Sequence, residues 1–355
     1  MRRAVIVGVI LFALCGVSAS ADGVDELIND FTSLVPEKIA DGLGDSEELC
    51  ELIGFESILS EIYAVLSENG GALLSFFSLL MGLLVLTSLA ATLHGVLGDV
   101  ARACASAISA VAIFERVYGL TEAVSGAITE SGDFFGGLIP LFAAVTSSGG
   151  GVGAATVGAT GMSLSLGVIG AVSGELLPPF IAAVFALGLL SDTDGAIGGL
   201  FKSVKGAIVW ILGILTFLLG TTLALQTVMA SASDGILMRG AKLTASGMVP
   251  IVGGALSGAM STLAAGLSYA KGFIGIGSVA VIVLISLSPL VLLLCYRGFL
   301  SLSVNFLGFL GTGRGTGCFS AMLGALDCLI AVFSMSTIVY IFEILLFIKS
   351  GVALL

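Results

Sequence analysis

The sequence predicts an all-α integral membrane protein, a polytopic bundle of transmembrane helices with a short acidic helical segment at its N-terminus. Of the 355 residues, 57% are hydrophobic and only 10% are charged, which is far from the composition of soluble domains. The apolar residues also form successive runs of roughly 18 or more, the length of a membrane-spanning helix. The strands of a membrane β-barrel would instead alternate over segments of about 10 residues.

Two uncharged runs stand at the centre of the chain, at residues 206–229 and 272–296. Each is long enough to cross a hydrocarbon core of roughly 30 Å. Between them, residues 248–270 are uncharged but rich in Gly, Ala and Ser. This composition favours a helix packed against other helices, or one that enters and leaves the bilayer by the same face.

The N-terminus predicts a secretory signal peptide over residues 1–21. Arg2 and Arg3 precede a short apolar core, and Ala19-Ser20-Ala21 supplies the small residues of a cleavage site. Cleavage before Asp22 would start the mature chain outside the cytoplasm. An uncleaved membrane anchor is the alternative.

Residues 22–69 form the predicted acidic extracytoplasmic segment, and residues 70–355 form the multi-pass membrane domain. The acidic segment holds 13 of the 24 acidic residues and one of the 13 basic residues, so its net charge is about −12 and that of the rest about +1. This balance argues against nucleic acid as a partner, because phosphate binding needs a basic surface.

The acidic segment predicts two amphipathic helices, because its apolar residues recur at spacings of three and four. Their apolar stripes need a covering surface, either the protein's own membrane domain or a partner in the outer compartment. The stripes comprise Val24, Leu27, Ile28, Phe31, Leu34 and Val35 in the first helix, and Leu52, Phe55, Leu59, Ile62 and Leu66 in the second.

We expect about seven spans in the membrane domain, some of them broken or re-entrant. The first covers residues 71–93, and a weaker span at 103–120 is followed by an acidic connection at 121–133. Residues 134–190 predict two spans with a discontinuity, or one span and a re-entrant hairpin. The last long span covers residues 321–348.

Basic residues leave the sidedness of the loops beyond the first span open. Lys202 and Lys205 precede the 206–229 run, and Arg239 and Lys242 follow it. The two pairs flank one helix, so the rule that basic loops stay in the cytoplasm fails at one of them.

A glycine-rich stretch predicts a helix break within residues 134–190. Glycine in a helix interior costs about 1 kcal/mol relative to alanine. A broken helix in a bilayer requires protein or water to satisfy the freed backbone groups. The predicted break residues are Gly149, Gly150, Gly151 and Gly153.

Four polar residues within apolar runs are candidate functional positions: Glu175, Gln226, Asp327 and Glu343. A charge inside the membrane is costly and usually marks an ion pathway or a polar partner. Glu175 lies beside Pro178-Pro179, where a kink would suit an ion carrier. The alternative places Glu175 in a loop and Glu343 at an interface near Lys349.

Catalytic motifs do not emerge from the sequence. His94 is the only histidine, and the six cysteines show no CxxC spacing, so metal sites and histidine-dependent catalysis have little material. The glycine-rich run lacks the Gly-Lys-Ser/Thr of a phosphate loop. We therefore expect a protein that is not an enzyme and that needs no metal or cofactor.

Residues 230–260 resemble the stage III sporulation protein AE family, multi-pass membrane proteins of endospore-forming bacteria. The resemblance is strongest in Ala230-Ser231-Ala232-Ser233-Asp234-Gly235 and in Val249-Pro250-Ile251-Val252-Gly253-Gly254. The chain departs from the family at Gly258 and Ser261, where acidic residues are common. The matching motif residues are Asp234, Gly235, Arg239, Lys242, Pro250, Gly253 and Gly254.

This resemblance implies a component of a channel or feeding-tube complex in the mother-cell membrane facing the forespore. It also implies partners: the other stage III proteins AA to AH, a forespore membrane protein and a membrane insertase. On this hypothesis the protein is a membrane platform or part of a conduit. The alternative is a secondary transporter or channel that moves a small solute or ion by itself, with its helix breaks lining the path.

Overall fold

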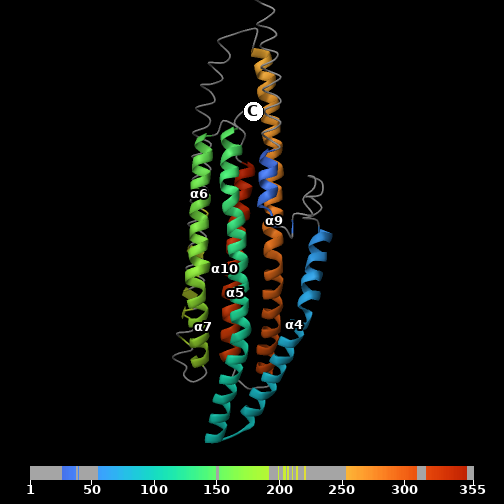
Figure 1. Cartoon of the computed structure of the whole chain (residues 1–355). Coiled ribbons are helices and arrows are strands. Elements are labelled where there is room, and N and C mark those ends of the chain that lie inside the picture. The colour runs from blue at the N-terminus through green and yellow to red at the C-terminus, as the bar shows by residue number, and fades with distance from the viewer. Residues whose placement is uncertain are drawn as a thin grey trace, which may run out of the picture.

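The computed structural model describes residues 26–36, 39, 55–148, 152–191, 253–309 and 317–349, with isolated positions between 199 and 220. Every element in this described part is a helix, which confirms the predicted all-α class. The long helices lie side by side along one axis (Figure 1). They are α4 (Phe55–Thr92), α5 (Val96–Ser148), α6 (Val152–Ala171), η1 (Val172–Leu176), α7 (Leu177–Ser191), α9 (Gly253–Phe309) and α10 (Gly317–Lys349).

Five stretches of the described helices are long and apolar enough to cross a membrane. Most of residues 192–252 lie outside the described part, so the total of about seven spans stays a prediction. The five are Glu56–Thr92, Val96–Ser148, Val152–Leu187, Ala265–Gly308 and Cys318–Lys349.

The two longest helices exceed the thickness of a bilayer. At a rise of 1.5 Å per residue, the 57 residues of α9 extend about 85 Å and the 53 residues of α5 about 80 Å. A hydrocarbon core is only about 30 Å thick. Both helices therefore continue well beyond the apolar layer.

The predicted connection at residues 121–133 is wrong, because α5 runs through it without interruption. Val124, Ala127 and Ile128 are buried there, whereas Glu122 and Glu130 are exposed. This is the spacing of an amphipathic helix, in which residues three and four apart share a face. The acidic residues mark the outer face of a helix and not the end of a span.

Residues 248–270 were expected to form a helix separate from the 272–296 run. This expectation is wrong, because residues 253–270 continue into that run within α9. Lys271 stands at the expected boundary, yet it is only 5% exposed. Its ammonium lies 5.0 Å from the centre of the Phe347 ring on α10. Packing of this cation against an aromatic face allows the helix to continue past the charge.

The helix α10 is the central element of the bundle. It contacts α5, α6, α7 and α9, and in Figure 1 it lies among them (red). In its most apolar stretch half of the residues are buried inside the bundle, a larger share than in the other four spans of the described part. Tyr340, Phe333 and Phe319 are almost completely buried along it.

A short helix at residues 26–34 packs against the membrane helices. Phe31 is fully buried and meets Phe134 of α5 and Phe273 of α9 edge to face, with ring centres 6.5 and 6.1 Å away. The first predicted amphipathic helix is thus covered by the protein's own bundle. Val24 lies outside the described residues.

The second predicted amphipathic helix and the first predicted span form one helix, α4, which passes through the expected boundary at residues 69 and 70. Phe76 packs against Tyr296, with ring centres 4.6 Å apart, and so joins the middle of α4 to α9. Nearer its start, Leu59 and Tyr63 are 46% and 75% exposed. Figure 1 shows this end of α4 diverging from the bundle.

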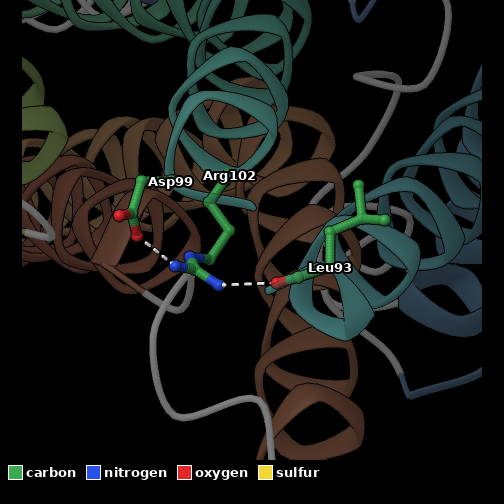
Figure 2. A network of polar contacts seen from close by, with 3 residues as sticks. All are labelled: Leu93, Asp99 and Arg102. Carbon is green, nitrogen blue, oxygen red and sulfur yellow. Dashed lines mark hydrogen bonds and ion pairs between the residues drawn. The ribbon is translucent and has the colours of Figure 1, made fainter. Parts of the chain in front are cut away.

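The turn between α4 and α5 is a tight helical hairpin. Gly95 adopts a positive φ of 77°, and the Gly98 amide donates to its carbonyl oxygen at 2.9 Å. Arg102 pairs with Asp99 and donates to the Leu93 carbonyl oxygen at 3.4 Å (Figure 2). A cation at the last carbonyl groups of α4 favours the end of that helix.

A π-helical segment, η1, separates α6 from α7. The Leu177 amide donates to the Val172 carbonyl oxygen, a bond over five residues instead of four. Pro178 and Pro179 follow at once and have no amide hydrogen to donate to the carbonyl groups four residues earlier. The wider turn accommodates this loss of regular helix bonds.

Candidate functional site

The polar residues of α10 are the best candidates for a functional site, because they enter the most buried part of the bundle. Asp327, Thr337, Tyr340 and Glu343 all lie on this helix. Asp327 and Glu343 are separated by about 24 Å along it, at 1.5 Å per residue. The two acidic candidates therefore occupy different levels of the bundle and do not form one site.

Asp327 belongs to an ion pair between α9 and α10. Arg297 Nε donates to Asp327 Oδ1 at 2.7 Å. The side chains of Arg297 and Asp327 are 45% and 29% exposed, so the pair lies at the side of the bundle. About three turns further along both helices, the hydroxyl groups of Ser286 and Thr337 form a second polar contact between α9 and α10, at 3.1 Å.

Glu343 lies inside the bundle and is only 1% exposed. Neither of its carboxyl oxygens has a hydrogen-bond partner in the described part of the chain. Ser165 of α6, also 1% exposed, lies beside it without reaching hydrogen-bond geometry. Burying an ionised carboxyl group with no partner costs several kcal/mol of folding free energy, whereas burying the neutral acid costs much less.

Tyr340 lies one turn before Glu343 on α10 and packs against α5. Its ring stacks on Phe135, with the centres 4.7 Å apart. Its hydroxyl group lies 3.3 Å from where a Cβ on Gly132 would stand. The absence of a side chain at Gly132 therefore leaves the room that the Tyr340 hydroxyl group occupies.

The structure does not bring Glu175 to this region of α10. Glu175 lies in η1 and its side chain is exposed. Gln226 lies outside the described residues, so its place relative to the other candidates is not defined. The three described candidates, Glu175, Asp327 and Glu343, do not form a single cluster.

The other predicted positions fall at helix ends or outside the described part. Gly253 and Gly254 begin α9, and Gly153 is the second residue of α6. The helix α5 ends at Ser148 and α6 begins at Val152, on either side of the glycine run. Asp234, Gly235, Arg239, Lys242, Pro250, Gly149, Gly150 and Gly151 all lie outside the described residues.

An open acidic groove of about 800 Å³ lies between the N-terminal helix and α5. This groove was not predicted from the sequence, because residues 121–133 were expected to form a connection. Read as a helix, this stretch places Glu122, Glu130 and Asp133 along one face, and that periodicity could have revealed the groove. The lining residues are Ser33, Leu34, Pro36, Glu122, Ser125, Gly126, Thr129, Glu130, Asp133 and Phe134.

Metal-binding chemistry finds no support in the described residues. No group of three or more His, Cys, Asp or Glu side chains there is placed to hold a metal ion. His94 is exposed in the turn after α4.

The long helices and their apolar surfaces define a polytopic α-helical membrane protein. The sequence model of one family, stage III sporulation protein AE, matches residues 42–351. The chain belongs to this family, and membership supports a role in sporulation. No curated protein and no solved structure matches the chain.

Proposed function

We propose that the protein is a multi-pass membrane component of the transenvelope complex that joins the mother cell to the forespore. The family match over residues 42–351 carries this proposal, together with the five membrane-spanning stretches of the described part. In this role the chain is a membrane platform or part of a conduit, and it performs no catalysis.

The proposed location is the mother-cell membrane that faces the forespore. Its proposed partners are the other stage III proteins AA to AH and a protein of the forespore membrane. A membrane insertase would place the chain in the bilayer. The predicted signal peptide would send residues 22–69 into the space between the two cells.

The start of α4 is the docking surface that best suits such partners. Leu59 and Tyr63 are 46% and 75% exposed there, and Glu56 and Glu61 lie beside them on the same helix. Exposed aromatic and aliphatic side chains with a polar surround are typical of protein interfaces. The stripe of the first helix cannot serve in this way, because the bundle already buries Phe31.

Affinity capture in mild detergent tests this function. The intact protein is recovered from sporulating and from vegetative cells, and co-purifying chains are identified by mass. We expect other stage III proteins with the wild type in sporulating cells only. Recovery of the protein alone in both growth states would contradict the proposal.

Two variants locate the docking surface. We expect Leu59→Ala with Tyr63→Ala to reduce the recovered partners about tenfold, the effect of losing roughly 1.4 kcal/mol of binding. The matched control is Leu74→Ala with Val85→Ala, because these residues are 70% and 59% exposed further along α4. Equal partner recovery by both double variants would exclude the start of α4 as the interface.

A second candidate function is transport of a small solute or ion by the protein alone. The burial of the unpartnered Glu343 carboxyl group favours it, since such groups occur along ion and proton pathways. Solute flux into liposomes containing the purified protein tests this candidate. For a carrier that uses Glu343, flux should be lost in Glu343→Gln while assembly with partners is retained; Glu175→Gln tests the predicted carrier role of Glu175 in the same way.

A further inference from the structure

We propose that Glu343 is a proton-binding site inside the helix bundle. It holds a proton while α10 is packed against α6 and α5, and it releases that proton when these helices separate. This site is distinct from the platform role, which requires no titrating group.

The geometry at Glu343 supports an uncharged carboxyl group. Its side chain is 1% exposed, and neither carboxyl oxygen accepts a hydrogen bond within the described part. An ionised carboxylate in such surroundings would lose its hydration with nothing to replace it, which costs several kcal/mol or more. A protonated carboxyl group carries no net charge, so its burial among apolar side chains costs much less than burial of the ionised form.

The charged and titratable groups around Glu343 are few. Helices α6 and α7 carry none along Val152–Ala171 and Leu177–Ser191. On α10 itself the neighbours are Tyr340 and, beyond Phe347, Lys349; α5 contributes Asp133, whose side chain is exposed. None of these groups forms an ion pair with Glu343 in the described part.

The helix α9 contributes Lys271, a buried cation that lies near the Glu343 end of α10. Its ammonium lies over the ring of Phe347, one turn beyond Glu343. The two unpartnered carboxyl oxygens show that this ammonium does not donate to Glu343. Glu343 and Lys271 thus lie near the same end of α10 without a hydrogen bond between them.

Asp327 on the same helix provides an internal comparison. It is 29% exposed and accepts a hydrogen bond from Arg297 Nε at 2.7 Å, so a cation stabilises its negative charge. Glu343 accepts no such hydrogen bond within the described part. The two acidic residues of α10 are therefore in opposite electrostatic situations.

The pH dependence of stability tests the proposal with the full-length protein in detergent. If the folded protein retains a proton at Glu343 that the unfolded chain releases, stability must fall as pH rises above the ordinary carboxyl value near 4.3. One released proton lowers the folding equilibrium constant about tenfold per pH unit. Thermal unfolding is measured from roughly pH 5 to pH 8 for the wild type and for Glu343→Gln.

We expect the wild type to lose stability relative to Glu343→Gln over this range. The difference should grow by about tenfold in equilibrium constant per pH unit for as long as the folded protein keeps the proton, and should level off once the folded protein also releases it. Glutamine preserves the shape of the protonated carboxyl group and cannot ionise. Comparison with this variant also removes the contributions of Tyr340, Lys271 and Asp133, which both proteins share. Asp327→Asn is the control, and we expect no such pH-dependent gain from it.

Two results would overturn the proposal. A wild type and a Glu343→Gln variant with parallel stability curves would show that Glu343 has the same protonation in both states. A wild type that gains stability relative to Glu343→Gln as pH rises would show that Glu343 is ionised and paired with a cation in the folded protein.

Infrared spectroscopy gives a direct second readout. The C=O stretch of a protonated carboxyl group is separate from the bands of ionised carboxylates and amides. We expect this band at neutral pH in the wild type and its loss in Glu343→Gln. No difference between the two spectra at neutral pH would contradict a bound proton at Glu343.

Discussion

Arg297 donates from its Nε to Asp327 Oδ1 at 2.7 Å and thereby fixes the register of α9 against α10. The antiparallel register continues at Ser286 and Thr337, whose hydroxyl groups are 3.1 Å apart. It continues further at Gly275, which lies against Ile348. Three contacts spaced along two long helices thus agree on one alignment.

The ion pair predicts a specific pattern of loss and rescue. We expect Arg297→Asp alone to reduce the stability of the protein, because it places two carboxylates next to each other. The loss should exceed the roughly 1 kcal/mol typical of removing a partly exposed pair. Adding Asp327→Arg should restore most of it, as measured by thermal unfolding in detergent. A double variant no more stable than the single one would show that the pair does not connect the helices.

The contact between Gly275 and Ile348 predicts a steric effect that a second substitution relieves. A Cβ on Gly275 would clash with Cγ1 of Ile348 and lie 2.7 Å from its Cδ1. We expect Gly275→Ala to cost about 1–3 kcal/mol, the usual range for overpacking a core. The smaller side chain of Ile348→Ala should offset much of this cost in the double variant. Gly272→Ala is the control, because nothing lies within 4 Å of its added Cβ.

The hairpin between α4 and α5 predicts that Gly98 cannot be replaced without movement of the turn. A Cβ there would overlap the Leu93 carbonyl oxygen that Arg102 also contacts (Figure 2). We expect Gly98→Ala to lower the free energy of unfolding by about 1–3 kcal/mol, which should be seen as a lower unfolding temperature. Gly119→Ala, further along α5 in open space, should change it little or raise it slightly. Equal behaviour of the two variants would refute the close approach at this turn.

Phe31 predicts how firmly the N-terminal helix is held. Its ring is fully buried between Phe134 and Phe273, so Phe31→Ala should remove about 3–5 kcal/mol of packing. We expect the helix at residues 26–34 to become sensitive to protease and to lose protection from hydrogen exchange while the membrane helices keep theirs. Asn29→Ala, on the exposed side of the same helix, should leave protease resistance unchanged.

The sequence predicted the helical membrane class because composition and run length alone determine it. Segment boundaries were harder, since hydropathy cannot distinguish an acidic loop from the outer face of a long helix. Residues 121–133 show the difficulty: Glu122 and Glu130 suggested a connection, yet Val124 and Ile128 are buried between them at helical spacing.

The candidate site was predictable only in part. Glu343 and Asp327 were visible as acidic residues within an apolar run, but their surroundings depend on residues distant in sequence. Arg297, 30 residues before Asp327, gives that acid a partner, and Ser165 of α6 lies beside Glu343. No spacing rule links these positions, because only the packing of three helices brings them together.

The π-helical turn at Val172–Leu176 changes the angular phase of the helix on either side of it. One extra residue in a turn rotates everything that follows by about 100°, the angle per residue of a helix with 3.6 residues per turn. Accordingly, α6 packs chiefly on α5, whereas α7 packs chiefly on α10. Glu175 and the two prolines therefore lie where the helix changes its angular position. Removing a single residue there would turn the apolar face of α7 away from α10.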